Sequence, residues 1–436
     1  MTPTAPPSPA TRHRPATRVR LVAAAVRASG GVSRRLGRGG SVIGGHVGLR
    51  LDKDAIAHLA EGRWIATVSG TNGKTTTTHL LAAALGAGGR VVTNAAGANL
   101  RTGVVAALSN DLWCTRAALE VDEATLAVVA AELRPAVIVL LNLSRDQLDR
   151  YGEVRIIGGR WRTMLGQLGA GVAPVPAGPS GAVAAGAAHV VANADDPLVV
   201  WSAEPARDVT WVAAGAAWTA DAAVCPECGG VITHDNGGWR CDGCPLTRPE
   251  PHYHLEGDVL VAPDGHRVEL RLQLPGRFNV ANAAMAAAAA AHAGVPLAAA
   301  AAAMAGTTEV AGRYRSVTVG AHDVRLLMAK NPAGWQEALG ILGPPPTPVI
   351  VGINARVADG HDPSWLWDVP FELLQGRTVV ATGDRARDLS VRLHYAGVPH
   401  TVHLGTPLDA ARTFPPGDVD LVGNYTVFAD VLEGLR

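Results

Sequence analysis

The sequence predicts an α/β protein with a central parallel sheet, an inserted four-cysteine ribbon and a second, Rossmann-like α/β domain at the C-terminus. Apolar strand-length segments alternate with helical segments and end in polar or glycine-rich loops, the pattern of a doubly wound sheet. The length of 436 residues suggests two or three domains. We expect a tail over residues 1–45, a central domain over 46–312 with its insertion at about 222–247, and a C-terminal domain over 313–436.

The composition excludes several classes of protein. Hydrophobic residues make up 48% of the chain and charged residues 17%, so the chain is not globally disordered. Zero formal net charge and 4% aromatic content argue against a general nucleic-acid binder. The alanine-rich run 283–304 is interrupted by His292, Gly294 and Pro296, so we expect two packed helices there and no membrane span. The clustered cysteines, which suit a reducing compartment, and the lack of an expected membrane span together predict a cytoplasmic protein.

The first 51 residues are basic. They contain no Asp or Glu and nine arginines, and the first sixteen residues should be disordered. Arg18–Ala28 predicts a short amphipathic helix with apolar Leu21, Val22 and Val26. We favour a solvated tail or a helix packed on the body, and the alternative is attraction to an anionic membrane surface.

A phosphate-binding loop opens the folded body. Trp64–Ser69 predicts a buried strand and 76–85 a helix, and a glycine loop lies between them. Glycines let backbone N–H groups approach phosphate oxygens, and the helix N-terminus adds partial positive charge. Lys74 would reach the β- and γ-phosphates and Thr75 would hold Mg²⁺. The alternative is a chance glycine turn before a helix. The loop residues are Gly70, Thr71, Asn72, Gly73, Lys74 and Thr75.

Carboxylates follow the next predicted strand, Ala117–Val121. Glu120 ends this strand, at the rim where ligands bind in open α/β sheets, and it is a candidate Mg²⁺ ligand. Asp122 and Glu123 follow directly. The alternative for Asp122 is a capping role at the next helix.

Four cysteines form two C-x₂-C pairs separated by twelve residues. This spacing predicts a structural Zn²⁺ site, because four thiolates close the tetrahedral shell. Turn residues over 235–238 suit a hairpin between the pairs. The alternatives are unligated thiols or a nucleic-acid-binding ribbon, although the intervening loop has no basic cluster. The predicted ligands are Cys225, Cys228, Cys241 and Cys244.

The C-terminal third predicts further strands at 317–319, 324–328, 348–353, 379–382 and 420–422. Between them, Asp362 precedes Pro363 and a short helix. The chemistry of the segment favours a helix-capping role for Asp362, and the alternative is a carboxylate that points outward into another protein's active site.

The chain resembles the Mur ligase family over roughly residues 60–315. The resemblance rests on the phosphate loop, Glu120 and the motifs at 142–149, 193–197, 276–282 and 312–313. It implies that ATP phosphorylates a carboxylate and that an amine attacks the acyl phosphate. By the resemblance, Lys74 and Glu120 are catalytic, Thr75 and Glu120 bind Mg²⁺, and ATP is bound by Gly70, Thr71, Asn72, Gly73, Lys74, Thr75, Thr76, Asn282 and Arg313.

Three departures from the family pattern bear on the substrate. Gln147 and Phe278 stand where many members have His, and residues 150–170 contain no Lys that could be carbamylated. These departures put a second metal in doubt and disfavour a standard amino-acid-adding role.

The ribbon and the C-terminal segment extend the resemblance to the MurT branch of the family, from about residue 45 to the end. This resemblance implies amidation of the D-glutamate α-carboxyl in the lipid II stem peptide, with ammonia from a separate GatD-type glutaminase. Asp362 would complete the partner's Cys–His pair. Ala355 departs from the Asp common in this branch, whereas Lys330-Asn331-Pro332 fits it. The rival functions are a folylpolyglutamate synthetase-type or Mur amino-acid-adding ligase, and a non-catalytic scaffold that binds ATP and zinc.

Overall fold

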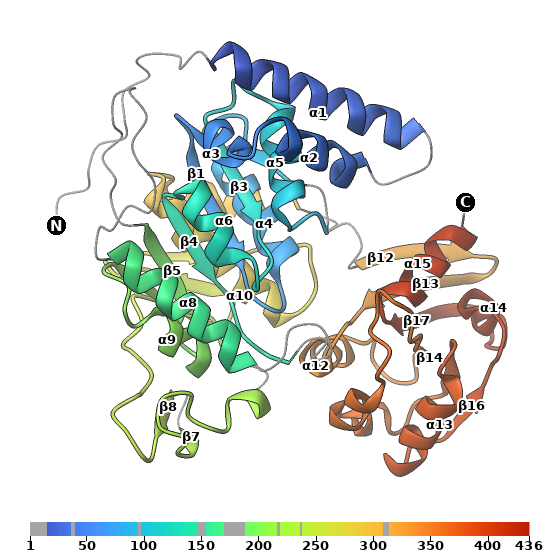
Figure 1. Ribbon diagram of the computed structural model, residues 1–436. Helices are drawn as coiled ribbons and strands as arrows, with labels where there is room; N and C mark the ends of the chain where they lie inside the picture. The colour runs from blue at the N-terminus through green and yellow to red at the C-terminus, as the bar shows by residue number, and fades with distance from the viewer. Residues whose placement is uncertain are drawn as a thin grey trace. The chain divides into compact units, whose positions relative to one another are not determined.

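The computed structural model describes residues 15–35, 40–94, 97–145, 154–169, 188–215, 219–235, 238–307 and 314–435 (Figure 1). Contacts divide the chain into two compact units. The first comprises residues 1–143 and 154–308, and the second comprises 144–153 and 309–436. Within the described ranges, no helix combines the length and apolar character that crossing a membrane requires.

A single sheet forms the centre of the first unit. Its described strands run in the order β11-β10-β9-β6-β5-β4-β1-β3-β2, parallel from β2 to β9, with β10 and β11 antiparallel at one edge. The parallel core confirms the predicted fold class. Its strands are β1 Trp64–Ser69, β2 Val92–Thr93, β3 Arg116–Glu120, β4 Val137–Leu140, β5 His189–Asn193, β6 Val209–Ala213, β9 Tyr253–Glu256, β10 Val259–Val261 and β11 Arg267–Glu269.

Helices cover this sheet. The helices α4, α10 and α11 pack against one another, and α6 contacts both β1 and α8. The alanines at 283–290 are almost fully buried, because small side chains allow α10 to pack closely on α4, so the two predicted alanine-rich helices are confirmed. The bounds are α3 Ala55–Ala60, α4 Lys74–Gly86, α5 Arg101–Asn110, α6 Leu126–Leu133, α8 Val154–Gly169, α9 Pro197–Ala203, η1 Ala220–Ala222, α10 Arg277–His292 and α11 Leu297–Met304.

The basic N-terminal region forms two helices, α1 (Thr17–Arg35) and α2 (Gly40–Leu51), that pack on each other and on α5 (Figure 1). The first helix is thus longer than the predicted Arg18–Ala28, and a second helix, which contains several glycines, follows at Gly40–Leu51. A Cβ atom on Gly45 would lie 2.0 Å from the Thr102 carbonyl oxygen, so glycine permits the close approach of α2 to α5. Residues 1–14 lie outside the described residues.

The cysteine-rich insertion contains a hairpin of β7 (Ile232–Asp235) and β8 (Gly238–Cys241), as predicted. Two tryptophans, one in α9 and one in β8, join the insertion to the rest of the first unit. The indole N–H of Trp239 donates to the Ala194 carbonyl oxygen (3.0 Å), and that of Trp201 donates to Glu227 Oε2 (2.6 Å).

The second unit contains its own sheet, in the order β12-β13-β17-β14-β15-β16 among described strands. All neighbouring pairs are parallel except β12 with β13. Trp335 and Phe371 are fully buried in the core on one face. The elements are β12 Tyr314–Val319, β13 His322–Met328, α12 Pro332–Gly340, β14 Val349–Gly352, η2 Ser364–Asp368, η3 Phe371–Leu374, β15 Val379–Thr382, α13 Ala386–Tyr395, β16 His400–Val402, α14 Pro407–Ala411, β17 Gly417–Gly423 and α15 Tyr425–Gly434.

Candidate active site

The predicted phosphate loop joins β1 to α4 at the carboxyl edge of the first sheet. The strand β1 lies between β3 and β4, where the strand order reverses and ligands bind in open α/β sheets. Gly70 and Gly73 have φ values of 147° and 84°. A Cβ atom on Gly73 would lie 2.5 Å from Asn282 Oδ1, so α10 brings Asn282 directly against the loop. Glycine at positions 70 and 73 therefore lets the loop adopt positive φ angles and pack against Asn282 and the segment after β4.

Asn142, directly after β4, holds the loop from the other side. Its side-chain oxygen accepts from the Asn72 N–H (2.8 Å), and its side-chain nitrogen donates to the Asn72 carbonyl oxygen (3.0 Å). The Thr71 N–H donates to the Asn142 carbonyl oxygen (3.0 Å). Sequence analysis included Asn142 only as part of a motif, and its position at a strand end was the signal for this role.

Lys74 begins α4 with its side chain buried. Its ammonium donates to Glu123 Oε2 (2.8 Å) and to the carbonyl oxygens of Gly70 (2.5 Å) and Thr71 (3.2 Å). A cation is thus fixed inside the loop at a helix N-terminus, an arrangement that suits anionic phosphate oxygens. Glu123 is a partner that sequence reasoning did not assign, although it lies three residues after the predicted Glu120.

Thr75 and Glu120 lie side by side. The Thr75 hydroxyl donates to Glu120 Oε2 (2.8 Å), and Asn99 Nδ2 donates to Glu120 Oε1 (3.2 Å). Asn94 fixes the Glu120 backbone through two hydrogen bonds of 2.8 Å, one from the Glu120 N–H and one to its carbonyl oxygen. The structure therefore brings together the two oxygen donors that were predicted to bind Mg²⁺. Hydroxyl and carboxylate oxygens are the ligands that Mg²⁺ prefers.

Asp122 completes this group of buried carboxylates. Its side chain accepts from the Ala124 N–H (3.0 Å) in the turn before α6, so it closes this turn and does not cap the helix. Burial and the neighbouring Glu123 raise the pKa of Asp122.

The remaining predicted residues of this site fall in three places. Thr76 is buried in the first turn of α4. Asn282 Nδ2 donates to Asn279 Oδ1 (3.4 Å) within α10. Arg313 and Gln147 lie outside the described residues.

The motif at 193–197 has a structural role at the same edge. Asp196 caps α9 by accepting from the N–H groups of Leu198 (2.9 Å) and Val199 (3.1 Å), and it accepts from the Leu143 N–H (2.9 Å). Burial raises the pKa of Asp196 to about 6. Asp195 accepts from Arg248 Nε (2.6 Å), which links this loop to the end of the ribbon.

The four cysteines of the ribbon form one compact cluster in which all four sulfur atoms lie within 4.8 Å of one another. The Sγ atoms of Cys225 and Cys244 are 3.6 Å apart, and those of Cys228 and Cys241 are 3.4 Å apart. These separations are close to the roughly 3.8 Å between thiolates of a tetrahedral site with Zn–S bonds of about 2.3 Å. The Gly230 N–H donates to Cys228 Sγ (3.3 Å). The donor set therefore fits a metal ion.

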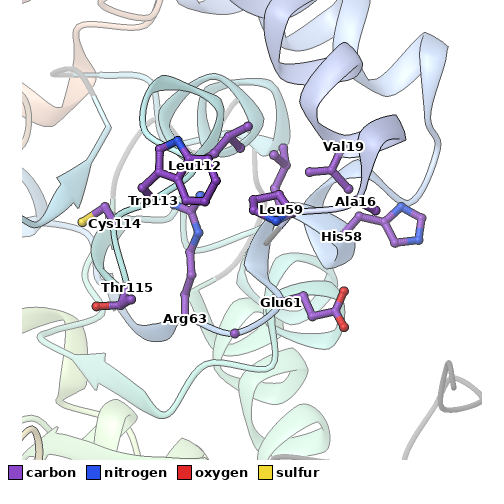
Figure 2. Close-up of a pocket in the computed structure, with 12 residues that line it drawn as sticks. Ala16, Val19, His58, Leu59, Glu61, Arg63, Leu112, Trp113, Cys114 and Thr115 are labelled. Atoms are coloured by element: carbon purple, nitrogen blue, oxygen red, sulfur yellow. The ribbon is translucent and has the colours of Figure 1, made fainter. Parts of the chain in front are cut away.

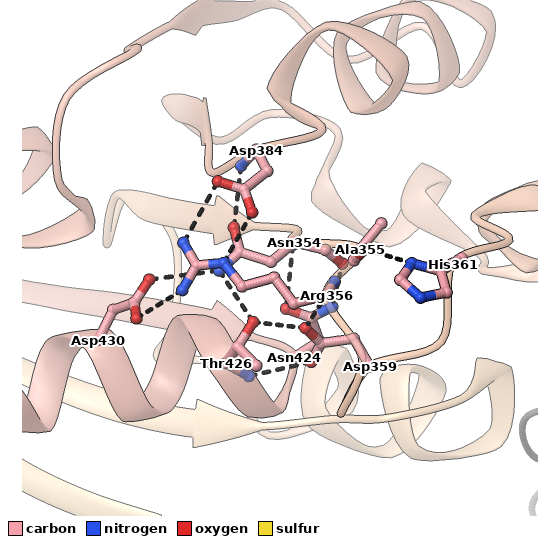
Figure 3. A network of polar contacts seen from close by, with 9 residues as sticks. All are labelled: Asn354, Ala355, Arg356, Asp359, His361, Asp384, Asn424, Thr426 and Asp430. Carbon is pink, nitrogen blue, oxygen red and sulfur yellow. Dashed lines mark hydrogen bonds and ion pairs between the residues drawn. The ribbon is translucent and has the colours of Figure 1, made fainter.

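Figure 3 shows the carboxyl edge of the second sheet, where a polar network holds the loop after β14. The Asn354 N–H donates to Asn424 Oδ1 (3.1 Å), and Asn424 Nδ2 donates to the Asn354 carbonyl oxygen (2.6 Å). Arg356 pairs with Asp384 (2.8 Å) and with Asp430 (2.8 Å). The loop is therefore tied to the loop after β15 and to α15.

Two aspartates of this loop have different environments. Asp359 is buried and accepts from the Thr426 N–H (2.9 Å) and the Thr426 hydroxyl. Asp362 is exposed and accepts from the Ser364 N–H (2.9 Å) and the Ser364 hydroxyl (2.9 Å). These bonds lower the pKa of Asp362. Pro363 occupies the N-cap position of η2, so the expected helix-capping role of Asp362 is wrong: its exposed carboxylate closes the turn before the helix.

A separate cavity of about 470 Å³ lies at the opposite end of β1 (Figure 2). It is formed near Arg63 and Thr115, which precede β1 and β3, whereas the phosphate loop follows β1. Cys114 borders it as a buried thiol. This cavity is not part of the candidate active site.

Comparison with known proteins finds one matching family model in each of the two units. Residues 68–164 match the Mur ligase middle domain, and residues 328–426 match the family described as MurT ligase C-terminal. The lipid II isoglutaminyl synthase (glutamine-hydrolyzing) subunit MurT of Streptococcus pneumoniae is 32% identical over 402 residues, which cover 86% of each chain. The chain belongs to the MurT family. The MurT subunit of Staphylococcus aureus strain N315 is 27% identical over 434 residues, covering 93% of this chain and 94% of that one.

Solved structures show that the MurT-family chain shares its fold with MurF and with a pseudomurein peptide ligase. MurF from Acinetobacter baumannii superposes with a TM-score of 0.61 at 18% identity, covering 89% of this chain and 80% of that one. A pseudomurein peptide ligase type C from Methanothermus fervidus gives 0.60 at 18% identity, covering 86% and 79%. The predicted resemblance to Mur ligases and to their MurT branch is confirmed.

Proposed function

We propose that this chain is the ATP-dependent ligase subunit of a lipid II isoglutaminyl synthase, acting with a GatD-type glutaminase. It would convert the D-glutamate α-carboxyl of the lipid II stem peptide to an amide. The observation that carries the proposal is the glycine loop in a MurT-family chain, with Lys74, Thr75 and Glu120 gathered at one sheet edge.

The residues at this edge suit carboxylate activation. Lys74 and the N–H groups at the start of α4 would bind the phosphates of ATP, while Thr75 and Glu120 would hold Mg²⁺. The γ-phosphoryl group would pass to the substrate carboxylate and release ADP. Ammonia would then attack the acyl carbon and phosphate would leave. Positive charge fixed at the phosphates favours the first step, because negative charge develops there. Asn282 and Arg313 would contact the nucleotide.

The four cysteines would hold one structural Zn²⁺. They supply four sulfur donors, so a bound ion would have no open position for substrate. The ion would stabilise the ribbon, which Trp239 and Arg248 join to the loop at 193–197. Metal analysis should find about one zinc per chain, as four thiolates would hold, and Cys225→Ser should lower both the zinc content and the melting temperature.

Asp362 would act in the partner's glutaminase site. A Cys nucleophile needs a base, and that base is oriented by a third group. Four of the five cysteines of this chain form the ribbon cluster and Cys114 is buried, so a glutaminase nucleophile would come from a separate subunit. Asp362 is exposed and so is accessible to a partner, whereas Asp359 is buried and bonded to Thr426 of α15.

The test is reconstitution of the complex. The chain is co-purified with its glutaminase and assayed on lipid II with glutamine and ATP, and the stem peptide is analysed by mass spectrometry. Conversion of the D-glutamate α-carboxyl to the amide, with one ADP formed per amide, supports the proposal. Incorporation of an amino acid instead of ammonia, or no nucleotide turnover with the intact complex, refutes it.

A further inference from the structure

The charges of this chain are distributed unevenly along it. The first 51 residues contain nine arginines and no acidic residue, which leaves 29 basic and all 38 acidic residues in the other 385. The N-terminal segment therefore carries a formal charge of +9 and the remainder −9, although the whole chain is neutral. Such an asymmetry gives the protein an electrostatic orientation in the field of a charged surface.

The helix α1 divides this segment into two faces. Val19, Val22 and Val26 are buried where α1 packs on α2 and α5. The opposite face is exposed over the whole length of the helix and carries basic and apolar side chains. Leu21 is 67% exposed and Val32 is 58% exposed. The exposed residues are Arg20, Leu21, Ala24, Arg27, Ala28, Val32 and Arg35.

The arginines on and beside this face differ in the contacts they make with the rest of the protein. Arg27 donates to the Ser109 carbonyl oxygen (2.6 Å), so it helps to fix α1 on α5. Arg18, at the edge of the face, pairs with the buried Asp52 (3.2 Å). Arg20 and Arg35 are exposed on the outer face; Arg20 precedes Leu21 in the chain, and Arg35 lies one helical turn after Val32.

We infer that the outer face of α1 binds an anionic lipid surface. Basic residues mixed with exposed aliphatic side chains on one face are the mark of a helix that lies in a membrane interface. Positive charge is attracted by anionic headgroups, while the negative remainder of the chain is repelled, so α1 would face the bilayer. The exposed leucine and valine favour a lipid surface over a nucleic acid. The inference rests on the proposed function in one respect, since it explains how the enzyme reaches a lipid-linked substrate.

The first experiment measures co-sedimentation of the intact complex with vesicles. Vesicles of phosphatidylglycerol and phosphatidylcholine in equal parts should bind the complex, and vesicles of phosphatidylcholine alone should not. Binding should weaken with added salt, because exposed charges are screened. Replacing Arg20 and Arg35 by Gln should lower the partition coefficient about 25-fold, since each arginine near the surface changes it by about fivefold.

Matched variants distinguish the effect of the α1 surface from the effect of lowering the net positive charge anywhere in the chain. Arg207→Gln combined with Arg315→Gln removes the same charge from exposed positions elsewhere in the chain and should leave vesicle binding unchanged. Leu21→Gln should reduce the binding that persists at high salt, because that part depends on apolar contact. Equal loss in both arginine pairs, or tighter binding to duplex DNA than to the mixed vesicles at the same salt, would overturn the inference.

The substrate assay keeps this inference separate from the proposed function. The Arg20→Gln, Arg35→Gln variant should amidate detergent-solubilised lipid II at the wild-type rate and show a raised KM for lipid II in anionic vesicles. An unchanged KM in vesicles would count against the membrane surface alone. Absence of amidation by the wild-type complex in detergent would refute the proposed function and leave the vesicle measurement valid.

Discussion

The loop after β1 in the first unit and the loop after β14 in the second are held in the same way. In each, an asparagine 70 residues further along the chain follows a neighbouring strand and makes two hydrogen bonds to the loop backbone. Asn142 does this for Asn72, and Asn424 does it for Asn354. Both loops share this pair of hydrogen bonds to the backbone, so the two sites differ in the side chains around the loop.

The two sheet edges differ in whether their charged side chains are buried or exposed. The first encloses Lys74 with Glu120, Asp122 and Glu123, and burial raises the pKa of Asp122. The second pairs its one loop arginine with aspartates and leaves Asp362 exposed, with a lowered pKa. A buried cation at a glycine loop suits a ligand that enters the protein, whereas an exposed carboxylate suits a partner outside it. Figure 3 shows how the loop that leads to Asp362 is held.

The largest effect that separates the two edges is expected from Asp362→Asn. Glutamine-driven amidation should fall about 10⁴-fold, the loss found when the acid of a catalytic triad becomes an amide. Amidation fed by ammonium chloride should be unchanged, because the phosphate loop is intact. The rates are measured with both nitrogen sources, and Asp388→Asn on α13 serves as an exposed control. An equal loss with glutamine and ammonia would contradict the division of roles.

Lys74→Met is expected to show the reverse pattern. Amidation should fall about 10²–10³-fold with either nitrogen source, as when one charge-stabilising donor is removed, while glutamine hydrolysis continues. Removing the lysine also leaves Glu123 buried without its cation, at a cost of about 3–5 kcal/mol of stability. The double variant Lys74→Met, Glu123→Gln should recover the melting temperature without recovering amidation. Activity in that folded double variant would refute the role of Lys74.

Asp196, at the first edge, should make the free energy of unfolding depend on pH. Its pKa is raised to about 6 from 3.8 in the unfolded chain, so the folded state holds the proton more tightly. The resulting stabilisation is complete below pH 3.8 and is lost as the pH rises through about 6, a change of about 3 kcal/mol at most. Urea unfolding at several pH values should show this loss in the wild type, and Asp196→Asn should flatten it. A wild-type slope that Asp196→Asn leaves unchanged would assign the titration to another group.

The sequence predicted most of the first edge and little of the second. The strand Trp64–Ser69, the glycine loop and the cysteine spacing are local patterns, and each predicted its element. The pairing of Asn354 with Asn424 could not be read from the sequence, because it depends on β17 lying beside β14. The helix α2 was missed for a related reason. Its glycines lower helix propensity, and only its close packing on α5 explains their presence.

The smallest effect is expected from Asp359→Asn, which tests whether the network in Figure 3 positions Asp362. Asp359 accepts from the Thr426 N–H and hydroxyl, and an amide can keep one of these bonds but not both at equal strength. Loosening the loop should lower the kcat of glutamine hydrolysis about tenfold, because one charged hydrogen bond contributes roughly 1.5–3 kcal/mol and only part is lost. The KM for glutamine and the ammonia-fed rate should not change, since Asp359 touches neither substrate. Thr426→Val should produce the same split, because it removes the hydroxyl from the other side of the contact. A change confined to the melting temperature in both variants would make the network a contributor to stability alone.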